Sequence, residues 1–138
     1  MKYELWNVNY LNFLSMENFS EQLKKRTKTF ALQIVKLCQS IPYNTVNSVL
    51  IKQLTKSGTS VAANYRAATR GRSDAEFFSK ICIVVEEADE SVFWLELFEE
   101  AKLLDNTTAR NYLQEAEEIL KIMVSIKNKT LVKLKKNK

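Results

Sequence analysis

Paired glutamates are the residues of this chain most suited to chemistry. Three pairs have the i, i+3 spacing that places both carboxylates on one helix face: Glu87 and Glu90, Glu96 and Glu99, Glu115 and Glu118. A di-iron site in a helical bundle also needs Glu-x-x-His, and the chain has no histidine. No nucleophile motif or glycine-rich phosphate loop is present either. We therefore expect solvated acids, no metal or cofactor, and no enzymatic activity.

The two cysteines do not add a reactive site. Cys38 and Cys82 fall in helix-like, partly apolar segments, and two cysteines without a secretory signal make no disulfide framework. Glu4 and several asparagines interrupt any signal-peptide stretch, and no run approaches the roughly 18 apolar residues of a membrane span. The sequence predicts a soluble, cytoplasmic protein without membrane contact. Met16 is an alternative natural start to Met1.

A second chemical feature is a row of cations on one expected helix. At about 100° per residue, Lys52, Lys56, Arg66 and Arg70 share one face of residues 45–70, opposite an apolar face. Arg72 follows directly after the helix. Because lysine and arginine neutralise phosphates, these five residues are candidates for nucleic-acid binding.

Four helices are predicted to position these side chains. Two glycines and one proline in 138 residues allow few turns, and apolar residues recur every three or four positions over about 20–40, 45–70, 74–103 and 106–127. Pro42, Gly71 and Asp105 or Asn106 mark the breaks, and Ser73-x-x-Glu76 is a capping box. The expected fold is all-α, an antiparallel up-down-up-down four-helix bundle over 17–128, with an N-terminal arm (1–16) and a basic C-terminal tail (129–138).

The third helix carries apolar residues on two faces. One face supplies the core, and the other holds four further side chains: Ile83, Phe93, Trp94 and Leu97. A surface helix of a monomer rarely needs a second apolar face. We therefore expect these four residues to contact a neighbouring subunit.

Charge is segregated along the chain. The formal net charge is +8 over residues 1–73, −10 over 74–118 and +7 over 119–138, and the sequence pI is about 9.2. Three interpretations stay open: ion pairing between adjacent helices, assembly of a basic face of one copy on an acidic face of the next, and binding of an anionic partner such as nucleic acid.

The second helix also carries a family signature. Residues 56–68, KSGTSVAANYRAA, resemble the signature of the 23S rRNA intervening-sequence family of four-helix bundle proteins, and the resemblance continues through EEADE (86–90) and FWLEL (93–97). It covers roughly residues 17–125. It implies a homopentameric ring of a bacterial protein. In one branch of the family, such proteins are accessory to retroelements and bind a reverse transcriptase and nucleic acid, but nothing in the sequence places this chain in that branch.

The signature residues have structural interpretations as well. Ser57 and Gly58 indicate tight helix packing, Asn64 is expected to bond a neighbouring helix, and Tyr65 to lie in the core with its hydroxyl at the rim. Arg66 and Arg70 either pair with acids of the third helix or contact phosphate. The leading hypothesis is a non-enzymatic oligomer that binds RNA or other nucleic acid electrostatically; the alternative is a protein-interaction module with no nucleic-acid role.

Overall fold

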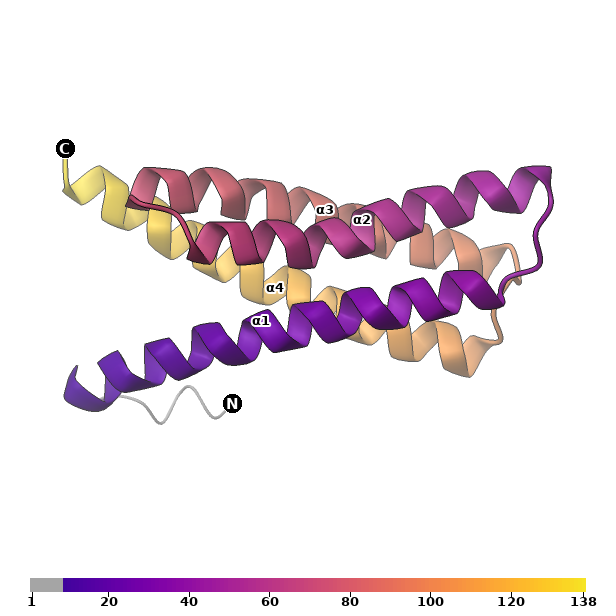
Figure 1. The fold of residues 1–138 in the computed structure, drawn as a ribbon, viewed down its shortest axis with the longest axis horizontal. Coiled ribbons are helices and arrows are strands. Elements are labelled where there is room, and N and C mark those ends of the chain that lie inside the picture. Colours follow the sequence, from indigo (N-terminus) through magenta and orange to yellow (C-terminus); the bar gives the residue numbers. More distant parts are fainter. Residues whose placement is uncertain (1–8) are drawn as a thin grey trace.

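Four helices follow one another through short turns. The computed structural model describes the backbone of residues 9–138 and the side chains of residues 18–138. The helices are α1 (Asn9–Ser40), α2 (Thr45–Thr69), α3 (Asp74–Glu100) and α4 (Asn106–Lys136), and no strand occurs between residues 9 and 138. Each helix runs antiparallel to the one before it (Figure 1). The predicted all-α, up-down-up-down four-helix bundle is confirmed.

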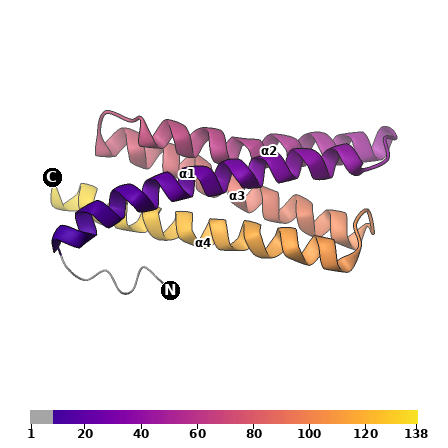
Figure 2. The same cartoon turned by 60° about the horizontal axis from the view of Figure 1, so that its bottom comes forward.

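One apolar core lies between the helices. Every helix contributes fully buried side chains; the largest are Phe30, Ile34, Leu54, Ile81, Leu95, Phe98, Ile119 and Met123. Consecutive helices pack closely along their length, whereas the backbones of α1 and α4 rarely approach one another (Figure 2). Side chains must therefore hold α1 against α4.

Arg26 makes the polar part of that contact. Its Nη2 and Nε lie 2.6 and 3.0 Å from the two carboxylate oxygens of Glu115, and Nη2 lies 2.9 Å from Glu118. The hydrogen bond to Glu115 raises the pKa of Arg26 against the opposing effect of burial. A two-point, partly desolvated contact of this kind fixes geometry as well as adding energy. The positive charge of Arg26 is thus neutralised by acids of α4.

Both terminal helices extend further than the sequence predicted. α1 begins at Asn9, so residues 9–16 of the predicted arm are helical, while residues 1–8 lie outside the described part. α4 continues to Lys136, through most of the predicted tail. Neither helix contains glycine or proline, and Leu131 and Leu134 are half-buried. Residues that lack a clean apolar period remained helical because nothing in them stops a helix.

Side-chain caps start the later helices. Asn44, Ser73 and Asp105 each accept a hydrogen bond from the backbone N–H three residues on, which satisfies a donor that the helix leaves free. At Asp105 the second carboxylate oxygen also accepts from the Thr108 hydroxyl, at 2.7 Å. The backbone bond from Thr108 is the main reason that the pKa of Asp105 is lowered from 3.8.

Replacing Asp105 with alanine is expected to lower the melting temperature at neutral pH. Because the folded pKa lies below the unfolded value of 3.8, the carboxylate stabilises the fold above pH 3.8, and this contribution is lost as pH falls through the folded pKa. Thermal melts by circular dichroism at about pH 7 and about pH 2 should therefore show the wild-type advantage shrinking in acid. Asp105→Asn keeps a capping side chain without an ionisable group, so its advantage over Asp105→Ala should depend much less on pH. An equal advantage at both pH values would contradict this role.

Candidate nucleic-acid interface

The outer face of α2 carries the predicted cations. Lys52, Lys56 and Arg66 are exposed, and Arg70 is exposed as the C-cap residue. They extend over about 27 Å at the helical rise of about 1.5 Å per residue. Arg72 is exposed in the turn before α3. The structure thus aligns four of the five predicted residues along one helix and sets Arg72 beyond its end.

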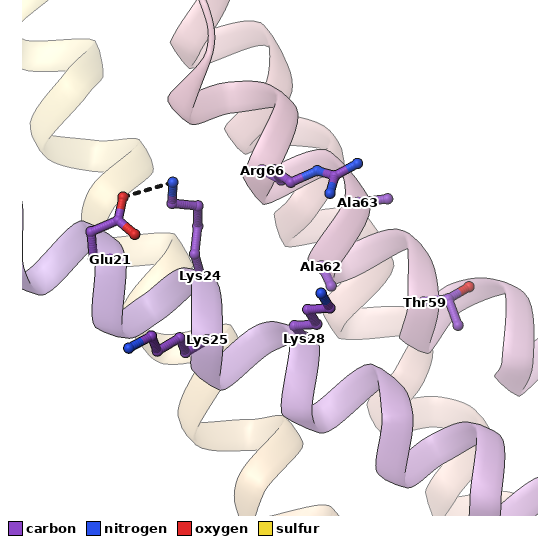
Figure 3. A pocket seen from close by; sticks show the side chains of 8 residues that line it. All are labelled: Glu21, Lys24, Lys25, Lys28, Thr59, Ala62, Ala63 and Arg66. Atoms are coloured by element: carbon purple, nitrogen blue, oxygen red, sulfur yellow. Dashed lines mark ion pairs between the residues drawn. The ribbon is translucent and has the colours of Figure 1, made fainter.

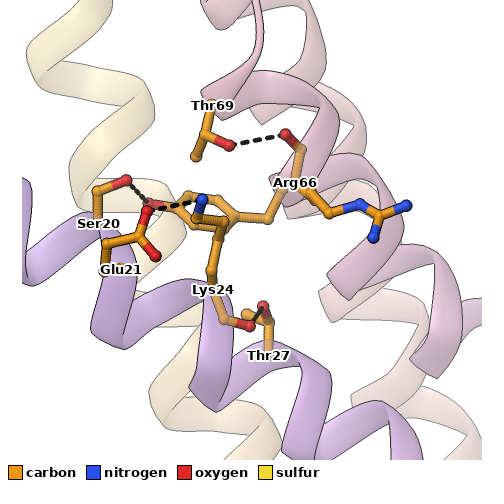
Figure 4. A network of polar contacts seen from close by, with 7 residues as sticks. Ser20, Glu21, Lys24, Thr27, Arg66 and Thr69 are labelled. Atoms are coloured by element: carbon orange, nitrogen blue, oxygen red, sulfur yellow. Dashed lines mark hydrogen bonds and ion pairs between the residues drawn. The ribbon is translucent and has the colours of Figure 1, made fainter.

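Two signature residues set how closely α2 lies on α1. A Cβ atom at Gly58 would stand 2.9 Å from Cγ2 of Ile34, so only glycine allows this approach. Tyr65 is 2% exposed, and its hydroxyl lies 3.3 Å from that of Ser20 on α1. Burial raises the pKa of Tyr65. Ser20 belongs to a polar group on α1 that includes Glu21 and Lys24, whereas the guanidinium of Arg66 on α2 points away from this group (Figure 4).

A pocket of 390 Å³ opens between α1 and α2 at this level. Figure 3 shows the lysines of α1 on one side and Arg66 with small side chains of α2 on the other. We call it the α1–α2 pocket; its lining residues are Glu21, Lys24, Lys25, Lys28, Thr59, Ala62, Ala63 and Arg66. Of the predicted cations, only Arg66 reaches it. The α1 lysines were not among the predicted binding residues, because the spacing within one helix does not show which residues of another helix lie at its level.

The charges of this region are unbalanced. Residues 18–73 hold ten lysines and arginines and one acid, Glu21, whose carboxylate lies 2.7 Å from Lys24. Within residues 18–138, no ion pair involves the six cations that we call the α1–α2 basic surface: Lys25, Lys28, Lys52, Lys56, Arg66 and Arg70. Their charge remains available to an external anion.

The acids of α3 form their ion pairs elsewhere, and only Glu87 lies near enough to a cation of the basic surface, Lys56, for that lysine to oppose the rise in its pKa. Glu99 pairs with Arg110 at 3.0 Å, and Asp74 lies 3.3 Å from Lys133. Neither Arg66 nor Arg70 forms an ion pair with an acid of α3 in the described part of the chain. Pairing within the chain therefore accounts for Arg26 but not for the predicted binding residues.

The second apolar face of α3 is only partly covered. Ile83, Trp94 and Leu97 are half-buried, whereas Phe93 is 52% exposed and packs edge-on against Trp94, with 4.9 Å between ring centroids. Among the described residues, two buried atoms lack a hydrogen-bond partner, and both lie on α3: Nε1 of Trp94 and Oε2 of Glu87. Burial is the main cause of the raised pKa of Glu87, and the negative charge of the neighbouring Glu90 raises this pKa further.

Of the remaining signature residues, one bonds to α3 and the other bonds within α2. Ser57 is buried and accepts a hydrogen bond from Ser91 of α3, at 3.1 Å between the hydroxyl oxygens. Asn64 was expected to bond a neighbouring helix; its amide donates instead to the Ser60 carbonyl of α2, at 2.9 Å. The Ser57–Ser91 contact therefore joins α2 to α3, whereas the Asn64 bond lies within α2.

Comparison with known proteins gives matches over most of the chain. The family model for 23S rRNA-intervening sequence protein matches residues 9–125. A crystal structure of a protein of unknown function from the S23 ribosomal protein family of Bacteroides thetaiotaomicron is 32% identical, with a TM-score of 0.70, and the match covers 79% of this chain and 97% of that chain. No curated protein matches. No helix of the described residues is long and apolar enough to cross a membrane.

Proposed function

The chain belongs to the 23S rRNA-intervening sequence protein family, and from that premise we propose that it is a non-catalytic, oligomeric, cytoplasmic protein that binds RNA through the α1–α2 basic surface. The observation that carries this proposal is the lack of ion pairs at all six cations of that surface within residues 18–138. Solvent-exposed cations without acid partners release counterions when they contact phosphates, and this release drives binding with little dependence on sequence.

RNA affinity is expected to fall steeply with salt. If four of the six cations contact phosphates of a single strand, raising the salt from about 50 to about 200 mM weakens binding about 50-fold, because the log–log slope is about −0.7 per contact. Fluorescence anisotropy of a labelled single-stranded RNA measures this directly. An affinity that does not change with salt, or no binding at low salt, would overturn the proposal.

Charge-reversal variants test whether RNA binds at the α1–α2 basic surface. The double variant Arg66→Glu, Arg70→Glu should abolish measurable RNA binding at about 100 mM salt and leave the helical content and the subunit number unchanged. A matched control, Lys80→Glu with Lys121→Glu, makes the same charge change at exposed lysines of α3 and α4 and should retain most of the binding. Equal losses in the two variants would mean that only net charge matters.

Oligomerisation rests on a separate observation. Phe93 is exposed on α3, and Trp94 and Glu87 each bury a polar atom without a partner among the described residues. Native proteins leave few such atoms unpaired and rarely expose a large apolar side chain beside others of its kind. A second copy that covers this face with a surface other than the α1–α2 basic surface would form a heterologous contact that closes into a ring. The family resemblance implies five subunits, and we propose that number.

The second apolar face of α3, which is only partly covered, also favours the alternative function, a protein-interaction module with no nucleic-acid role. The variant Arg66→Glu, Arg70→Glu separates the two. If its subunits dissociate while each stays helical, and wild-type protein binds no RNA at low salt, the cations serve assembly. Sedimentation velocity and circular dichroism of the same sample provide both measurements.

A further inference from the structure

The α1–α2 pocket concentrates charge in a way that an extended strand does not require. Three lysines and one arginine line it, and its single acid, Glu21, lies 2.7 Å from Lys24. Lys25, Lys28 and Arg66 form no ion pair within residues 18–138. The formal charge of the lining is thus +3. Figure 3 shows the head groups of Lys25 and Arg66 directed to opposite sides, so these long side chains turn inward when they meet one ligand. An internal phosphodiester brings one negative charge per nucleotide, so a strand passing over the pocket would neutralise only part of it.

The lining also indicates which part of a ligand is bound. Thr59, Ala62 and Ala63 form the α2 side, and small side chains let a bulky anion approach both helices at once. Thr59 adds a hydroxyl, although that hydroxyl already donates to the Thr55 carbonyl at 2.7 Å, so its oxygen remains as an acceptor. No aromatic side chain lines the pocket, and bases are recognised largely by stacking on aromatic rings. The pocket therefore suits a compact, highly charged group and offers nothing for a base.

We propose that the α1–α2 pocket binds a terminal polyphosphate chain, such as the 5′-triphosphate of an RNA, through Lys25, Lys28 and Arg66. A triphosphate carries three or more charges on adjacent phosphorus atoms, which matches the charge and the small volume of 390 Å³. The guanidinium of Arg66 can hold two phosphate oxygens at once, and the lysines act as point charges. Where the polyphosphate is the end of an RNA, this inference rests on the proposed function; a free nucleotide or inorganic polyphosphate presents the same chemistry.

The test compares two RNAs of identical sequence, one with a 5′-triphosphate and one with a 5′-hydroxyl, by anisotropy with the full-length protein at about 150 mM salt. Wild-type protein is expected to bind the triphosphate RNA on the order of tenfold more tightly, the gain from about one added charge-assisted contact. The pocket variant Lys28→Gln, Arg66→Gln should reduce that ratio to about one. The matched control Lys52→Gln, Arg70→Gln removes the same charge from α2 outside the pocket; it should weaken both RNAs and keep the ratio.

Inorganic tripolyphosphate distinguishes the two sources of the ligand. It should raise the melting temperature of wild-type protein and of the control variant, but not of the pocket variant. Glu21→Gln removes the only acid of the lining and should increase this shift. If wild-type protein binds the two RNAs equally well and tripolyphosphate does not change its melting temperature, polyphosphate binding at the pocket is overturned. The proposed function would be unaffected. Binding of tripolyphosphate without any binding of RNA would support the pocket and overturn the proposed function.

Discussion

Replacing Gly58 with leucine is expected to destabilise the bundle by about 3 kcal/mol, the upper part of the range for overpacking a core. A Cβ at this position would lie 2.9 Å from Cγ2 and 3.0 Å from Cγ1 of Ile34. Ile34 is fully buried and β-branched, so it has no room and few rotamers with which to yield. The better helix propensity of leucine returns only about 0.8 kcal/mol. For a domain of this size the melting temperature should fall by about 10 °C.

The control for this prediction is Ala63→Leu, which adds a similar volume at an exposed position of the same helix and should change the melting temperature little. Adding Ile34→Ala to Gly58→Leu creates space for the new side chain. The double variant should therefore be less destabilised than the sum of the single changes, with a coupling of about 1–3 kcal/mol. Equal melting temperatures for Gly58→Leu and Ala63→Leu would mean that α1 and α2 do not meet closely at Gly58.

The apolar period and the turn residues were sufficient to predict the fold. Pro42 and Gly71 are helix-breaking residues next to good caps, so the ends of α1 and α2 were placed within about a residue, and the capping box at Ser73 fixed the start of α3. The predicted start of α1 and the predicted end of α4 were wrong, because these segments contain no stop signal and no clean apolar period. A segment without a stop signal continues as a helix beyond the point where its apolar period is lost.

The candidate site was predicted less completely. Helical periodicity places Lys52, Lys56, Arg66 and Arg70 on one face because that arrangement depends on one helix alone. The contribution of Lys24, Lys25 and Lys28 depends on which helix lies beside α2 and at what level. The same limit applies to Arg26, which resembles its neighbours in sequence but pairs with Glu115, 89 residues away. Contacts between helices could not be derived from the spacing within either of them.

The largest effect on assembly is expected from the α3 face. Replacing Phe93 and Leu97 with serine should convert the proposed oligomer to a 16.0 kDa monomer that keeps its helical content. Phe93 is 52% exposed, so its removal costs the isolated fold little, whereas a buried aromatic side chain often contributes about 2 kcal/mol, roughly 30-fold in affinity, to an interface. In a closed ring every subunit contact loses this amount, so dissociation should be nearly complete at micromolar concentration. Sedimentation velocity measures the mass.

Leu32 provides a matched control because it is 54% exposed on α1, almost the same fraction as Phe93 on α3. If α3 forms the interface, Leu32→Ser leaves the mass unchanged. Dissociation of Leu32→Ser but not of the Phe93 variant would move the interface to α1, where it would compete with RNA for Lys25 and Lys28. A wild-type mass of 16.0 kDa would show that the protein is a monomer and forms no ring. RNA affinity would then come from the six cations of one chain, without a gain from multivalency. The mass and the RNA affinity of each variant, measured on the same sample, therefore determine whether assembly and binding use separate faces of the bundle.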